Sequence, residues 1–228
     1  MMSIHDAACN GNTNRVRTLL NEGTHVNVRN RDGNTLLHRA IEYGHVRVVR
    51  LLLERGADVN ARNVRGETPL HRVGLRGNAT IAHELILRGA HVNARDARMC
   101  TPLHNAVYES HASVVQELLR HGAYVNAHEI FGRTPLYFAL QDRRTRIARM
   151  LVEAGATISS QHRQMVSSNS PTYASLGARA ASRWLGTVRR QRKERAERML
   201  ASPRLLGGTQ LNKNAVSAIA RYVTVKPK

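Results

Sequence analysis

The sequence predicts an all-α fold: a solenoid of helix-turn-helix units joined by β-hairpin turns, followed by a basic two-helix tail. Two short motifs recur every 33 residues along most of the chain. The first is a Thr-x-Leu-His or Thr-Pro-Leu-Tyr block, found at 35–38, 68–71, 101–104 and 134–137. The second is Gly-x-x-Val-Asn, found at 23–27, 56–60, 89–93 and 122–126, with a divergent copy at 155–159. Two motifs in phase at one period indicate stacked repeats.

The second complete unit, residues 63–95, shows how each element is specified. Thr68 is a good N-cap, and Pro69 occupies the first helical position, where its missing N–H costs nothing. A first helix is therefore expected to about Arg76, and Gly77 allows the left-handed turn that ends it. A second helix with an aliphatic stripe follows, and an extended arm then leads to the next hairpin turn. One unit cannot bury its stripe alone, so neighbouring units must stack.

These motifs resemble the ankyrin-repeat family, whose units combine Gly-x-Thr-Pro-Leu-His, a central Gly, a Val/Leu stripe and Gly-Ala-Asp-Val-Asn-Ala. The resemblance covers residues 3–162 and implies a repeat array over 1–162. It implies five units: a truncated N-terminal cap at 3–29, then complete units at 30–62, 63–95, 96–128 and 129–162. Compact ankyrin proteins with unusual tails are frequent among viral and bacterial host-interaction proteins, and this chain is open to the same interpretation.

Four residues depart from the family pattern. Gly74 stands inside a first helix where the other units carry a large aliphatic residue, and we expect it to weaken its layer. Met99, Ser110 and Arg143 stand where the pattern expects a turn glycine. We expect a strained or altered inter-helix turn at Arg143.

The resemblance implies a protein partner that binds a concave face made of hairpin tips and first helices. Arginine recurs along the tips and predicts two short ladders, one of Arg29, Arg62 and Arg95 and one of Arg31, Arg65 and Arg98. The planar guanidinium group pairs bidentately with carboxylates, so a partner with an acidic surface is expected. The candidate contacts are Arg29, Arg31, Arg62, Arg65, Arg95 and Arg98 at the tips, Phe131 at the last tip, and Tyr43, Arg76 and Tyr108 on the first helices. The alternative is that the tip arginines are solvated, with Asp32 and Asp96 neutralising some of their charge.

Charge is concentrated at the C-terminal end. The formal net charge is +19; residues 1–162 hold 21 Arg against 14 acidic residues, whereas residues 163–228 hold 14 Lys and Arg against two Glu. The pattern predicts a linker at 163–174 and a basic helical tail at 175–228. Its basic cluster is Arg189, Arg190, Arg192, Lys193 and Arg195.

Three interpretations of the tail remain open. It could cap the last repeat, its basic cluster could bind nucleic acid or direct nuclear import, or its last helix could recruit a ubiquitin-ligase subunit. All four lysines lie in the tail. Codon bias towards arginine explains this, as does avoidance of ubiquitination on the repeats beside a ligase.

Several function classes are not supported by any motif. The chain has no nucleophile elbow, phosphate loop or dinucleotide-binding turn, and two distant cysteines cannot form a usual zinc set. We expect no enzyme activity, no cofactor and no metal. No apolar run approaches the roughly 18 residues that span a bilayer, and the N-terminus lacks a secretory signal. A monomeric, intracellular protein is expected, in the cytoplasm or alternatively the nucleus.

Overall fold

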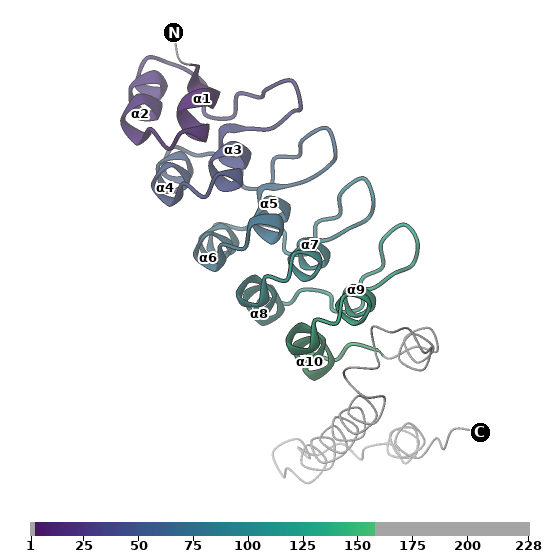
Figure 1. Cartoon of the computed structure of the whole chain (residues 1–228). Coiled ribbons are helices and arrows are strands. Elements are labelled where there is room, and N and C mark those ends of the chain that lie inside the picture. The colour runs from purple at the N-terminus through teal and green to yellow at the C-terminus, as the bar shows by residue number, and fades with distance from the viewer. Residues whose placement is uncertain (1–2, 158–228) are drawn as a thin grey trace, which may run out of the picture. The chain divides into compact units, whose positions relative to one another are not determined.

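A computed structural model describes residues 3–157 of the chain. Within this range it contains ten α-helices in five antiparallel pairs, and no β-strand longer than a single bridge (Figure 1). The helices are α1 (Ile4–Cys9), α2 (Thr13–Asn21), α3 (Leu36–Glu42), α4 (Val46–Glu54), α5 (Pro69–Arg76), α6 (Ala79–Leu87), α7 (Pro102–Tyr108), α8 (Ala112–Arg120), α9 (Pro135–Gln141) and α10 (Thr145–Glu153). The predicted all-α repeat array is confirmed.

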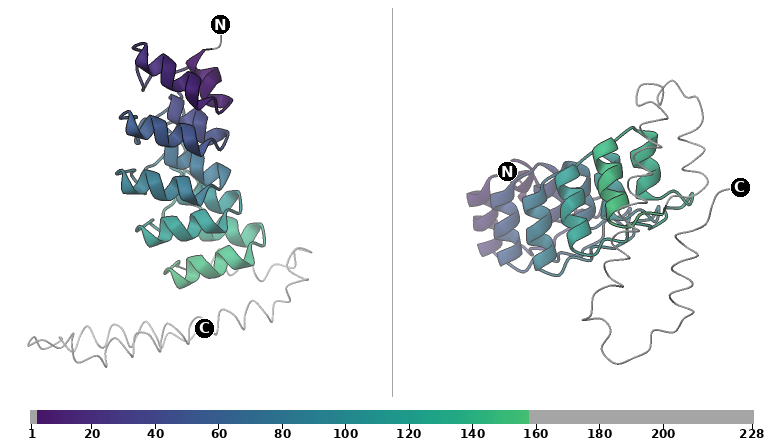
Figure 2. Two further views of the ribbon diagram at one scale, coloured as in Figure 1. Left: turned by 90° about the vertical axis from the view of Figure 1, so that its left-hand side faces the viewer. Right: turned by 90° about the horizontal axis from the view of Figure 1, so that it is seen from below.

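The five helix pairs stack in sequence order. The odd-numbered first helices form one layer, the even-numbered second helices form another, and loops project from the side of the first helices (Figures 1 and 2). The core between the layers is aliphatic, with fully buried residues such as Leu36, Leu52, Leu70, Leu103 and Leu151. Each unit therefore buries its apolar face against its neighbours.

The first helices begin as the sequence predicts. Thr35, Thr68, Thr101 and Thr134 are their N-caps, and the first three form capping boxes with a histidine at the third helical position. Helix α5 starts at Pro69 and ends at Arg76, and Gly77 follows with a left-handed backbone (φ 85°).

The long loops have hairpin form but almost no strand pairing. Each is closed by a backbone hydrogen bond across its base, for example from Asn63 N to Glu67 O at 3.0 Å. The described residues contain one isolated antiparallel bridge, between Arg29 and Thr35. The hairpins are too short for a ladder, because only three residues lie between the closing pair and the first helices begin soon afterwards.

Three histidines join successive units, and we call His38, His71 and His104 the seam histidines. In each, Nδ1 accepts hydrogen bonds from the N-cap threonine of its own helix. Nε2 then donates to a carbonyl of the following unit, at 3.1 Å for His38 and 3.0 Å for His71. The histidine of each Thr-x-Leu-His block thus links its own unit to the next one.

The predicted linker and tail, residues 163–228, lie outside the described residues. The basic cluster of the tail and both of its predicted helices therefore remain predictions. Among the residues that the structure describes, no helix is long and apolar enough to cross a membrane.

Candidate partner-binding face

Exposed apolar side chains gather on the loops and first helices. The structure describes eight exposed large hydrophobic residues, and six of them lie there: Tyr43, Val64, Met99, Tyr108, Ile130 and Phe131. The tips are residues 29–33, 62–66, 95–99 and 128–132, and together with the exposed ends of the first helices we call them the partner face. Solvated loops rarely need such residues, so their concentration on one face indicates an interaction surface.

The first predicted arginine ladder holds the tips together. The guanidinium of Arg29 donates to the carbonyl of Arg62, and the guanidinium of Arg62 donates in turn to the carbonyl of Arg95. Arg29 also donates to Gly33 O within its own hairpin. Arg29 and Arg62 therefore each bind a backbone carbonyl of the next unit, a role that the repeat pattern does not predict.

The second predicted ladder is differently arranged. By repeat register, Arg31 matches Val64, whereas Arg65 and Arg98 match Phe131, so the three arginines do not form one row. Arg65 Nε lies 3.2 Å from Glu67 Oε2. Arg31 and Arg98 are exposed, and neither guanidinium has a hydrogen bond or ion pair within residues 3–157.

Backbone hydrogen bonds fix the tips relative to one another. The amide of Val64 donates to Asp32 O at 3.0 Å, and the amide of Ile130 donates to Arg98 O at the same distance. Ala97 N makes the equivalent bond to Arg65 O at 2.9 Å. The tips thus form a continuous row that carries both exposed apolar and exposed basic residues.

The first helices of the N-terminal half carry a charged network. The carboxylate of Glu42 forms ion pairs with three guanidinium groups, with N–O distances of 2.6 Å to Arg39, 3.3 Å to Arg76 and 3.7 Å to Arg72. The guanidinium of Arg39 also lies over the ring of Tyr43, 5.1 Å from its centroid. Arg76 remains about half exposed, so Tyr43 and Arg76 both stay available to a partner.

A buried ion pair adjoins this network, because Arg72 contacts both Glu42 and Glu67. Arg72 and Glu67 are both buried, and their charged atoms lie 3.1 Å apart. Burial alone would raise the pKa of Glu67, but the hydrogen bond from Asn63 and the charges of Arg72 and Arg65 outweigh it and lower the pKa. Glu67 is therefore ionised at neutral pH, and it fixes Arg72 in place.

The last tip and helix α9 form an aromatic cluster. The guanidinium of Arg133 lies 4.9 Å from the ring of Phe138, 5.1 Å from that of Phe131 and 5.9 Å from that of Tyr137. Tyr108 meets Phe138 edge to face at 6.1 Å. Phe131 and Tyr108 remain exposed, so the cluster presents two aromatic faces to solvent.

Comparison with known families agrees with this architecture. A sequence profile for ankyrin repeats in three copies matches residues 4–96 and again residues 70–162. The chain belongs to the ankyrin-repeat family. Ankyrin repeats generally mediate protein–protein interactions, and the family is typically a non-catalytic scaffold. No curated protein sequence matches this ankyrin chain.

The networks around Glu42 and Arg133 were missed by sequence reasoning. Arg76 lies 34 residues after Glu42, and Glu84 lies 34 residues after Arg50, which it contacts at 2.8 Å. Facing residues of adjacent ankyrin units are thus offset by the 33-residue period plus one. Charge pairs at that offset are the signal that could have found the Glu42 network.

Proposed function

We propose that this ankyrin array binds a protein partner through the partner face, and that the bound segment is acidic with apolar side chains among its carboxylates. The proposal rests on one observation. The exposed guanidinium groups of Arg31 and Arg98, which have no hydrogen bond or ion pair within residues 3–157, lie in the row of tips with the exposed side chains of Val64, Ile130 and Phe131.

The chemistry of the row matches such a ligand. Arginine recognises carboxylates bidentately, and large aromatic and arginine side chains supply most of the binding energy at protein interfaces. The tips are also pre-organised, because backbone hydrogen bonds and the Arg29 and Arg62 staples join them. A preformed surface loses less conformational entropy on binding.

The test compares two charge-reversal variants of the full-length chain. The tip variant carries Arg31→Glu and Arg98→Glu, and the control carries Arg47→Glu and Arg149→Glu, two exposed arginines of the second helices α4 and α10. Partners are captured from cell extract after nuclease treatment, identified by mass spectrometry, purified and measured by calorimetry. We expect the tip variant to bind at least about tenfold more weakly than the control, a loss of about 1.4 kcal/mol or more.

Equal affinity of the two variants would contradict the proposal, as would loss of every partner after nuclease treatment. The same capture with residues 1–165 separates the array from the tail, because array partners must bind both forms. Loss of binding on removal of residues 179–198, with a steep salt dependence, would instead indicate nucleic-acid binding by the tail. Loss of ligase components on removal of residues 209–228 would indicate a substrate adaptor.

A further inference from the structure

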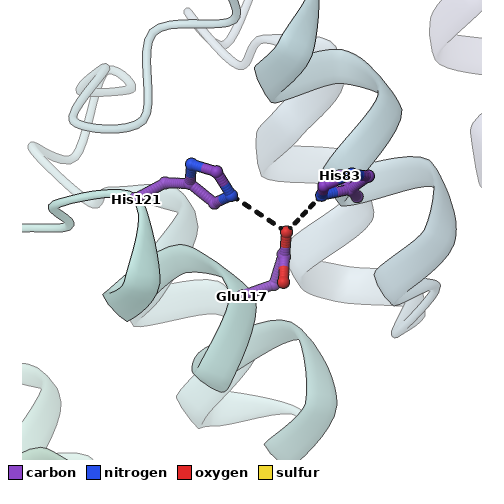
Figure 3. A group of neighbouring side chains, drawn as sticks. All are labelled: His83, Glu117 and His121. Atoms are coloured by element: carbon purple, nitrogen blue, oxygen red, sulfur yellow. Dashed lines mark hydrogen bonds and ion pairs between the residues drawn. The ribbon is translucent and has the colours of Figure 1, made fainter.

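Three side chains able to bind a metal meet on the second helices, away from the partner face (Figure 3). His83 lies on α6, Glu117 lies on α8, and His121 is the C-cap of α8. Oε1 of Glu117 is 2.6 Å from Nδ1 of His83 and 3.1 Å from Nε2 of His121. One ligand atom from each residue lies within 4.8 Å of the other two.

The fold brings these residues together in two ways. Glu117 and His121 are four residues apart, so they share one face of the helix and its end. His83 lies 34 residues before Glu117, at the same offset that joins Arg50 to Glu84 between α4 and α6. The Arg50 contact is a simple pair, whereas a third residue, His121, converges on the same oxygen atom at Glu117.

The donor set suits Zn²⁺. Two imidazole nitrogens and one carboxylate oxygen form the three-ligand set of open zinc sites, in which water takes the fourth position. Ligands about 2.0–2.1 Å from a tetrahedral ion lie roughly 3.3 Å from one another. The contact between His83 and Glu117 must open slightly to admit the ion, and it can do so because the His83 side chain is 52% exposed.

The carboxylate of Glu117 supplies the negative charge that a cation needs. The hydrogen bond from His83 lowers the pKa of Glu117; desolvation opposes this, and His121 adds to the lowering, so the carboxylate is ionised at neutral pH. Arg120 Nη1 lies 3.8 Å from the other carboxylate oxygen, Oε2. Its side chain is 66% exposed and is free to turn towards solvent when an ion binds.

We propose that His83, Glu117 and His121 form a Zn²⁺ site with three protein ligands and one open position. The ion joins α6 to α8 and thereby clamps the unit at 63–95 to the unit at 96–128. Because the second helices lie on the other side of the first helices from the tips (Figure 1), the ion stabilises the ankyrin array without covering the partner face.

The test uses untagged full-length protein stripped of metal with a chelator. Titration with Zn²⁺ by calorimetry should give one ion per chain, and Co²⁺ should give the visible absorption of a tetrahedral centre. His83→Ala, Glu117→Gln and His121→Ala should each weaken Zn²⁺ binding at least about tenfold, since even losing an outer-shell partner commonly costs that much. His91→Ala, which removes an exposed histidine outside the cluster, should leave the affinity unchanged.

Thermal unfolding provides the second readout. Zn²⁺ should raise the Tm of the wild type and of His91→Ala, but not that of the triple variant His83→Ala, Glu117→Gln and His121→Ala. Equal Tm values without metal show that the variants fold. The proposal is wrong if the wild type shows no saturable one-to-one binding, or if the triple variant binds Zn²⁺ as tightly as the wild type.

Discussion

At the scale of single residues, three positions hold a backbone that suits glycine. Met99, Ser110 and Arg143 have φ values of 63°, 64° and 57°. They stand at turn positions where other units use glycine, as at Gly66 and Gly77. A non-glycine residue in the left-handed region costs roughly 1–2 kcal/mol, so each turn is formed at an energetic cost that the packed helices on either side offset.

Replacing one of these residues by glycine should stabilise the protein. We expect Ser110→Gly to raise the free energy of unfolding by about 1 kcal/mol, because the strain removed exceeds the added chain entropy of the unfolded state. The matched control is Ser113→Gly, three residues later on an exposed position of α8, which should lower stability by about 0.5 kcal/mol. Urea unfolding measures both. If Ser110→Gly destabilised the protein as much as the control, the left-handed φ of Ser110 would carry no strain.

At the scale of elements, Gly74 sets the approach of two first helices. A Cβ atom built on Gly74 of α5 would lie 2.6 Å from the carbonyl oxygen of Pro102 and 3.0 Å from Cβ of Asn105, both on α7. The loss of an aliphatic side chain at this position predicts a weaker layer. The structure adds that the missing side chain makes room for the neighbouring helix α7.

The sign of the change in the free energy of unfolding caused by Gly74→Ala distinguishes these two interpretations. Helix propensity alone predicts a gain of about 1 kcal/mol, whereas overpacking against α7 predicts a loss of about 1–3 kcal/mol. We expect the loss, measured as a lower urea midpoint with an unchanged slope. A higher midpoint would show that α7 moves away at little cost.

Features that recur in every unit could be predicted from the sequence, whereas contacts made by residues of one unit alone could not. The N-cap threonines, the glycine-type turns and the seam histidines recur every 33 residues. The pattern of one unit therefore locates the same features in the other units. Glu42 pairs with Arg72 and Arg76 of the next unit, whereas Arg133 contacts aromatic residues of its own unit that the other units do not repeat. The Glu42 network therefore spans two units, and the close approach at Gly74 likewise depends on the neighbouring unit. The position of the partner face on the tips and first helices came only from the family resemblance, and it stays a prediction.

At the scale of the whole molecule, the seam histidines link the array to pH. Burial lowers the pKa of His38 and of His104 to about 4, against a weaker opposing effect of their hydrogen bonds to backbone carbonyls. The pKa of His71 is lowered by burial as well. Each of these rings is neutral when folded, because Nδ1 accepts from threonine while Nε2 donates across the unit boundary.

Acid should therefore destabilise the array, because the seam histidines take up protons when the chain unfolds. The unfolded chain has an ordinary histidine pKa of about 6.5, so between pH 6.5 and 4 it binds protons that the folded chain excludes. Stability is complete above pH 6.5 and falls as the pH drops towards 4, by about 2 kcal/mol at pH 5 for each of His38 and His104. Urea unfolding at pH 7 and pH 5 measures this loss. The double variant His38→Gln, His104→Gln should be less stable at pH 7 but should lose about 4 kcal/mol less between the two pH values. Equal losses in the variant and the wild type, or seam imidazole resonances that titrate near pH 6.5 in the folded protein, would place the acid sensitivity elsewhere in the molecule.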